Sequence, residues 1–103
     1  MIIAVEIPVE SLKRFCRKWG IQRVALFGSV LRADFGPGSD VDVLVDFQAG
    51  AMRSLLDLAE AEEELSSIFG RPVDLVDRKS IERSENWIRR RDILGSATIV
   101  YEE

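Results

Sequence analysis

An alternating run of eight residues constrains the fold of this chain more than any other feature. The segment Asp40–Phe47 reads DVDVLVDF, with valine at positions 41, 43 and 45. Successive side chains of a strand point to opposite faces, so the three valines share one face and the aspartates share the other. The valine face requires burial. We therefore predict a strand in a small mixed sheet that is covered by helices.

Helices and further strands are predicted in close succession around this strand. Glycine follows two of the predicted helices, at Gly20 and Gly70, where a helix terminator is expected. The first half is predicted to contain a helix from Pro8 or Val9 to about Trp19, a strand over Ile21–Phe27, a short helix over Val30–Asp34, a loop over Phe35–Ser39 and the strand Asp40–Phe47. The second half is predicted to contain a helix over Leu55–Phe69, a strand over Val73–Val76 and a helix over Ile81–Leu94. An extended tail over Thr98–Tyr101 follows, which suits an edge strand. This pattern predicts an α/β (α+β) fold of helices on a mixed sheet, whose strand order the sequence leaves open.

The long predicted helix carries apolar and acidic residues at helical spacing. Its apolar series includes Leu55, Leu58, Leu65 and Phe69, which we expect to face the sheet. We interpret the acidic positions 60 and 62–64 as its solvated side.

Size and composition predict one soluble domain, spanning residues 1–103. The chain has 103 residues and a net charge of −4, without the basic excess of a dedicated duplex-DNA binder. It contains no histidine, which excludes Cys–His catalysis and histidine metal sites. Its one cysteine, Cys16, cannot form an intramolecular disulfide, and we interpret it as a packing residue. With neither a membrane span nor a secretory signal in the sequence, we expect a cytoplasmic protein.

Asp40 and Asp42 are the first candidates for chemistry. They flank Val41, so both carboxylates share a face, with Cα atoms roughly 6.5–7 Å apart. Their repulsion is relieved if cations bind between them, and two Mg²⁺ ions about 3.5–4 Å apart suit such a site. The alternative is a polar, solvated sheet face, which Asp46 continues.

Two further features accompany this pair. Gly28-Ser29 joins a predicted strand to a predicted short helix, where a glycine allows close backbone approach and helix N–H groups favour phosphate. Such turns also carry Gly-Ser for geometry alone. Asp74 lies within the strand VDLV, and stands roughly 5 Å from Asp40 or Asp42 if the two strands are neighbours. Otherwise it faces solvent. Asp77 is out of phase, and we expect it to begin a loop.

The spacing of these residues resembles a known signature. Gly28-Ser29, ten residues and Asp40-Val41-Asp42 match the Gly-Ser…Asp-x-Asp pattern of the DNA polymerase β-type nucleotidyltransferase superfamily. The longer string GSVLRADFGPGSDVDVLVDF resembles the minimal nucleotidyltransferase group, and so does GRPVDLV at residues 70–76. The matched features cover about half of the chain. The resemblance implies the polymerase β palm-like nucleotidyltransferase fold.

The resemblance also implies roles for individual residues. In this superfamily three carboxylates hold two Mg²⁺ ions, which orient the triphosphate and activate the attacking hydroxyl. Asp40 and Asp42 match the metal-ligating pair, and Asp74 matches the third carboxylate, on the acceptor side. Gly28 and Ser29 match the loop that contacts the β- and γ-phosphates. Nucleotidyl transfer depends on such positioning and charge neutralisation.

Two more residues of the matched region are candidates for nucleotide binding. Arg32 lies three residues after Ser29, on the same face of the predicted short helix, where the group usually has arginine. It suits a bidentate phosphate contact or a solvated charge. Ser39 precedes Asp40 and shapes the turn, with a ligand contact as the alternative.

The C-terminal third is basic, with Arg89-Arg90-Arg91 on the last predicted helix. We interpret this run as a solvated helix face, with a partner contact as the alternative. Trp87 and Ile88 belong to the core or to an interface. The apolar and basic character of this helix makes it our candidate docking face.

The minimal group that this chain resembles is typically encoded beside a HEPN-type protein, an RNase toxin. By resemblance, we expect a protein adenylyltransferase antitoxin that uses ATP and Mg²⁺ to add AMP to a tyrosine of that toxin, its partner. The larger superfamily members carry acceptor-binding domains, for which this chain leaves no room after Asp74. An acceptor protein that docks on the chain meets that need.

Other functions remain open. The alternatives are a chain that neutralises its partner by binding alone, one that modifies a small molecule such as an antibiotic, and a nucleotide- or metal-binding subunit of a larger transferase. Transfer of a labelled nucleotide separates the first alternative from the enzymes. The identity of the acceptor separates the others.

Overall fold

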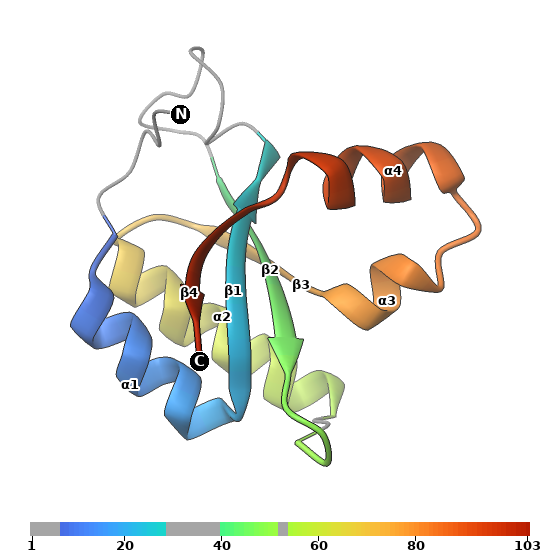
Figure 1. The fold of residues 1–103 in the computed structure, drawn as a ribbon. Helices are drawn as coiled ribbons and strands as arrows, with labels where there is room; N and C mark the ends of the chain where they lie inside the picture. The colour runs from blue at the N-terminus through green and yellow to red at the C-terminus, as the bar shows by residue number, and fades with distance from the viewer. Residues whose placement is uncertain (1–6, 29–39, 52–53) are drawn as a thin grey trace.

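The computed structural model describes residues 7–28, 40–51 and 54–103, and within them helices cover both faces of a four-stranded mixed sheet (Figure 1). The elements are α1 (Val9–Trp19), β1 (Ile21–Phe27), β2 (Val41–Phe47), α2 (Leu55–Phe69), β3 (Val73–Asp77), α3 (Arg78–Glu82), α4 (Trp87–Ser96) and β4 (Thr98–Glu102). The predicted α/β class is confirmed. The predicted short helix Val30–Asp34 and the loop Phe35–Ser39 lie outside the described residues.

The sheet has the strand order β3-β2-β1-β4. β1 pairs antiparallel with both β2 and β4, whereas β2 and β3 run parallel and are connected through α2. A parallel pair requires such a crossover, and the helical pattern of Leu55–Phe69 supplies it. The tail strand β4 pairs along the outer side of β1, which confirms the expected edge strand.

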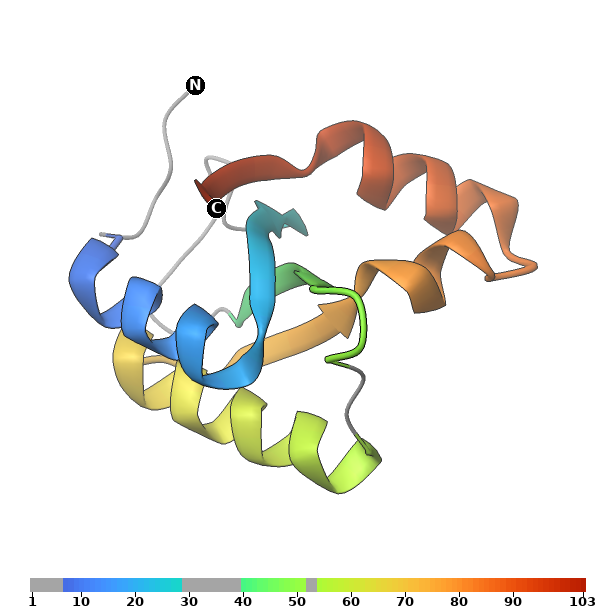
Figure 2. The same cartoon turned by 60° about the horizontal axis from the view of Figure 1, so that its bottom comes forward.

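The main core lies between the sheet and the helices α1 and α2, which cover the same face (Figure 2). The three valines of β2 are fully buried there, as their alternation predicts. Phe15 and Cys16 of α1 and Leu65 of α2 pack into the same cluster. Burying each of these side chains contributes about 1.5–3 kcal/mol, so this face determines how β2 is oriented.

The opposite face carries a second, smaller core beneath α3 and α4. Leu44 is 1% exposed and packs with Ile81 of α3 and Ile93 of α4. The face that β2 shares between Asp42, Leu44 and Asp46 is therefore not a solvated polar surface. The two aspartates flank a buried leucine, one towards each end of the strand.

The predicted helix over Ile81–Leu94 is wrong, because the structure has two helices in this region. α3 begins directly after β3, where Asp77 ends the strand and caps the helix by accepting a hydrogen bond from Lys79 N at 3.2 Å. α3 ends at Glu82. Asn86 then caps α4, since its side chain accepts a hydrogen bond from Arg89 N at 3.1 Å. Asparagine favours such a cap over a helix interior.

The predicted faces of α2 also need correction. Leu55 is 84% exposed, and the buried residues of the helix are Ala61 and Leu65. Of the predicted solvated acidic side, Glu60 and Glu63 are exposed as expected, whereas Glu62 and Glu64 make tertiary contacts. Glu62 accepts a hydrogen bond from Leu75 N of β3 at 2.8 Å. Glu64 accepts two hydrogen bonds from α1, one from Lys18 Nζ at 2.6 Å and one from the indole N–H of Trp19 at 3.0 Å.

Of the helices within the described ranges, none is both long enough and apolar enough to cross a membrane.

Cys16 provides a test of the main core. Burial, with a smaller contribution from Glu103, raises the pKa of its thiol to about 12, and the side chain is fully buried. Because the thiolate is the reactive form, we predict that a disulfide reagent at pH 8 labels Cys16 only through unfolding. Labelling at a rate close to that of the urea-denatured chain, under native conditions, would contradict this packing.

Candidate active site

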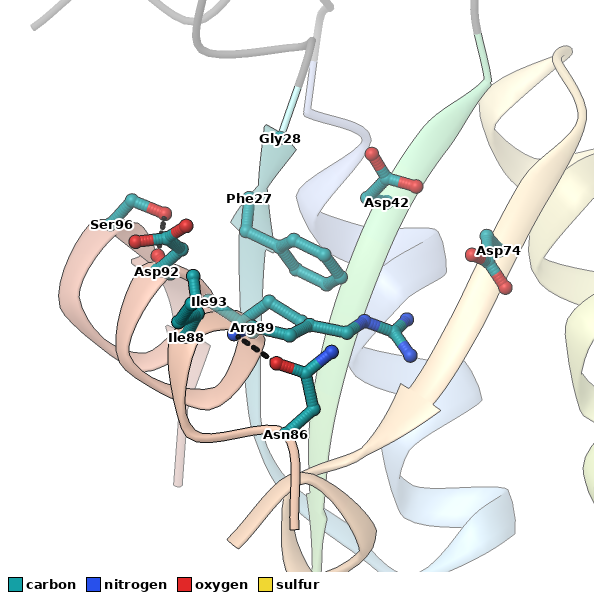
Figure 3. Close-up of a pocket in the computed structure, with 10 residues that line it drawn as sticks. All are labelled: Phe27, Gly28, Asp42, Asp74, Asn86, Ile88, Arg89, Asp92, Ile93 and Ser96. Atoms are coloured by element: carbon teal, nitrogen blue, oxygen red, sulfur yellow. Dashed lines mark hydrogen bonds between the residues drawn. The ribbon is translucent and has the colours of Figure 1, made fainter. Parts of the chain in front are cut away.

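Two aspartates face each other at the edge of the sheet where β2 and β3 begin. Asp42 and Asp74 are each the second residue of their strand, and the parallel register pairs one with the other. Adjacent strands stand about 4.8 Å apart. Asp42 is half-buried and Asp74 is exposed, and both side chains point to the same side of the sheet in Figure 3. The predicted neighbouring of the two strands is thus observed.

Gly28 lies at the same edge, because β1 runs antiparallel to β2 and its last residue, Phe27, pairs with Asp42. The φ angle of Gly28 is +74°, in the left-handed region. A Cβ atom built on Gly28 would stand 2.2 Å from Oδ2 of Asp42, closer than any real contact. Only glycine therefore allows the Asp42 carboxylate to approach the end of β1, whereas the predicted phosphate contact of Gly28 stays a prediction.

A cavity of about 550 Å³ opens over these residues, within the range of small-ligand pockets. The sheet forms one wall, and α4 with the residue that caps it forms the other (Figure 3). Its lining residues are Phe27, Gly28, Asp42, Asp74, Asn86, Ile88, Arg89, Asp92, Ile93 and Ser96. The cavity thus combines apolar residues with the carboxylates of Asp42 and Asp74 on the sheet wall, and with the guanidinium of Arg89 and the carboxylate of Asp92 on the α4 wall.

Asp46, on the same face of β2, is occupied by cations of the chain itself. Its Oδ2 lies 2.9 Å from Arg78 Nε and 3.3 Å from Arg23 Nη1, and its side chain is 13% exposed. These contacts connect β2 with the start of α3 and with β1. The third acidic residue of the DVDVLVDF run therefore has a structural role, which separates it from Asp42.

The remaining predicted site residues stand differently. Asp40 is exposed and directly precedes β2. Within the described part of the chain, no three acidic or cysteine side chains are grouped to hold a metal ion, so a metal role for Asp40 stays a prediction. Ser29, Arg32 and Ser39 lie outside the described residues, and their nucleotide contacts stay predictions as well.

Two carboxylates from adjacent strands nevertheless fit a magnesium ion. Mg²⁺ is bound through one or two carboxylates together with waters and substrate phosphates, rather than by a complete protein cage. Asp42 and Asp74 supply the carboxylates from a rigid sheet edge, and the cavity above them leaves room for phosphates.

Arg89 and Asn86 are site-lining residues that the sequence did not identify. Residue spacing indicates a solvated face for the arginine run, which hides the position of Arg89 in the cavity. The predicted continuous helix runs through Asn86, which hides its role as a helix cap. The asparagine two residues after Ser84 was the available signal for a helix start at this point.

Comparison with known proteins decides the family. A model of the nucleotidyltransferase domain matches residues 9–100, nearly the whole chain. The chain belongs to this nucleotidyltransferase family. The match runs from the start of α1 into β4, so the sheet edge described above lies inside the matched domain.

Curated relatives of this nucleotidyltransferase carry more specific names. Protein adenylyltransferase MntA of Thermococcus cleftensis is 39% identical over 69 residues, which are 67% of this chain and 68% of that protein. A Methanocaldococcus jannaschii protein, provisionally named a protein adenylyltransferase, is 41% identical over 64 residues, 62% of this chain and 67% of that protein.

Solved structures share the fold. A protein provisionally described as a minimal nucleotidyltransferase is 34% identical, with a TM-score of 0.63, over 85% of this chain and 84% of that one. A toxin–antitoxin structure with AMP-PNP superimposes with a TM-score of 0.71 at 20% identity, over 94% of this chain and 75% of that one. At that identity the second likeness establishes the fold alone.

The close contact between Gly28 and Asp42 makes a prediction about this nucleotidyltransferase. Gly28→Ala introduces a Cβ into the Asp42 carboxylate, which must move to avoid it. We expect nucleotidyl transfer to fall about 100-fold, because displacing a reacting group by an ångström has an effect of this size. Transfer of label from α-³²P-ATP measures it.

Gly70→Ala is the matched control for this variant. Gly70 has a similar φ of +69°, but a Cβ there meets no atom within 4 Å. Both variants pay the same backbone strain of about 1–2 kcal/mol, and only Gly28→Ala adds the clash. Equal activity losses in the two variants would show that the contact with Asp42 has no part in the reaction.

Proposed function

We propose that this nucleotidyltransferase is a protein adenylyltransferase antitoxin, which transfers AMP from ATP to a tyrosine of a HEPN-type toxin in the cytoplasm. The observation that carries the proposal is the pairing of Asp42 with Asp74 at the edge of a nucleotide-sized cavity. Adenylyl transfer needs oriented phosphates and neutralised charge rather than a covalent protein nucleophile. A carboxylate pair with Gly28 beside it meets that requirement.

The reaction is a single displacement at the α-phosphorus. The tyrosyl oxygen bonds to the α-phosphorus while the bond to the oxygen that bridges the α- and β-phosphates breaks, and pyrophosphate leaves. Asp42 and Asp74, with Asp40 as the expected third ligand, would hold magnesium, which would supply charge neutralisation for the phosphates. Asp74 is the more exposed carboxylate of the facing pair, and we assign it the phenolic proton.

Relatives support the choice of a protein acceptor. The Thermococcus protein that is 39% identical is named a protein adenylyltransferase. A structure with a TM-score of 0.62 and 21% identity contains a tri-AMPylated Shewanella oneidensis HEPN toxin in complex with an MNT antitoxin. Because this chain belongs to the nucleotidyltransferase family, both proteins support a protein acceptor for it.

The surface beside the cavity also suits a protein acceptor. Trp87 is 58% exposed and Ile88, which lines the cavity, is 51% exposed. Exposed aromatic and aliphatic side chains of this kind anchor protein interfaces. Their position on α4 puts an apolar contact area on the side of the cavity that lies across from the aspartates, where a docked partner can present a tyrosine to the cavity.

Label transfer tests this function. We predict that the wild-type chain, with Mg²⁺ and α-³²P-ATP, labels the HEPN-type protein encoded beside it. Asp42→Asn and Asp74→Asn should each reduce labelling at least 100-fold, because each removes a charge that faces the phosphates. Mass spectrometry of the labelled partner should locate on a tyrosine an addition of roughly 329 Da, the mass of one AMP group, for each AMP transferred.

Asp77→Asn is the control for these variants. Asp77 lies on the same strand as Asp74 but caps α3, and asparagine caps a helix equally well. It should retain wild-type labelling. If the wild type leaves its partner unlabelled yet binds and silences it, the chain neutralises by binding alone. Label on a small molecule rather than on protein would contradict the proposed acceptor.

A further inference from the structure

Arg89 extends a positive charge into the cavity from the wall that faces the two aspartates. It belongs to the first turn of α4, and its side chain reaches from that helix towards β2 and β3 in Figure 3. Its backbone N–H donates to the side chain of Asn86 at 3.1 Å, so the helix start from which the guanidinium projects is capped. The arginine is thus presented by an ordered element.

The guanidinium of Arg89 forms no ion pair with another residue of the described ranges. Among the described residues, Arg78 pairs with Asp46 and Arg91 with Asp92, whereas no ion pair involves Arg89. Arg91 also stacks over the Trp87 ring at 5.3 Å, which turns it away from this role. Of the three consecutive arginines on α4, only Arg89 lines the cavity.

The α4 wall carries Arg89 and also Asp92, whose carboxylate is paired with Arg91 at 3.6 Å, so Arg89 is the charge on this wall that no ion pair among the described residues neutralises. The carboxylates of Asp42 and Asp74 attract a cation, and the planar guanidinium favours a bidentate contact with a phosphate. One ligand class satisfies both walls at once, namely a polyphosphate that carries a divalent metal ion. Its metal meets the aspartates while its outer oxygens meet the arginine.

We propose that Arg89 binds the phosphate chain of the nucleoside triphosphate from the side opposite Asp42 and Asp74. This inference rests on the proposed function for the nature of its substrate. It adds a binding residue outside the Gly-Ser…Asp-x-Asp signature, contributed by α4. The triphosphate is then held between the sheet edge and α4, which brings the acceptor-facing surface of α4 next to the α-phosphorus.

A binding titration tests the role of Arg89 without relying on transfer. The probes are AMP-PNP with Mg²⁺ and, as a ligand without phosphate, adenosine, each followed by ¹H–¹⁵N NMR, which also reports folding. We expect Arg89→Met to weaken AMP-PNP binding tenfold or more, as loss of a charge-assisted hydrogen bond does, and to leave adenosine binding unchanged (about tenfold per 1.4 kcal/mol). Arg89→Lys should be intermediate, because it keeps the charge and loses the fork.

Arg83→Met is the matched control, because it removes the same charge from an exposed residue outside the cavity. Arg83 is the C-terminal cap of α3 and does not line the cavity. It should bind AMP-PNP like the wild type. Wild-type affinity in Arg89→Met, an equal loss in Arg83→Met, an equal loss for adenosine, or a wild-type chain that binds no AMP-PNP would each overturn the inference. A loss confined to Arg89→Met, in a chain that transfers no AMP to its neighbour, would uphold the inference and overturn the proposed function.

Discussion

The parallel pairing of β2 with β3 is the constraint on which the rest of the site depends, because it sets Asp42 against Asp74. Like charges on adjacent strands repel each other, and because Asp74 is exposed to solvent this repulsion costs about 1 kcal/mol or less. On the opposite face of β2, three fully buried valines contribute about 5–9 kcal/mol. Apolar burial therefore outweighs the repulsion, and the fold holds the two charges together for a cation to use.

The surroundings of each aspartate, rather than its strand position, decide its role. Asp42 and Asp46 share one face of β2 on either side of Leu44, which is covered by α3 and α4. Asp46 meets Arg78 and Arg23 and ties the start of α3 to the sheet. Asp42 instead opens into the cavity beside Gly28, where the chain leaves room for a ligand.

The strands and the two longest helices were predictable because local signals agreed with tertiary packing. The alternation in DVDVLVDF, and the glycines at positions 20 and 70, correspond to the observed strand and helix ends. The pairing of Asp42 with Asp74 followed once the strands were neighbours. The strand order itself depends on which edges meet in three dimensions, and nothing local to the sequence records it.

The break between α3 and α4 escaped prediction because the seven-residue spacing of Ile81 and Ile88 suits one continuous helix. The capping asparagine competes with that pattern, and the cap prevails. A continuous helix would leave Arg89 on a solvated face, whereas the break lets α4 direct Arg89 into the cavity. Its importance depends on the direction in which α4 returns over the sheet, which residue spacing alone does not reveal.

The proposed function requires Asp42 and Asp74 to hold a metal-bound nucleotide jointly at the sheet edge. A crystal structure with AMP-PNP and Mn²⁺, read through the anomalous signal of manganese, tests it most directly. The expected result is a manganese peak that contacts both carboxylates, together with nucleotide phosphate oxygens inside the cavity that Gly28 lines. Manganese and nucleotide bound elsewhere, with Asp42 and Asp74 free of metal, would contradict it.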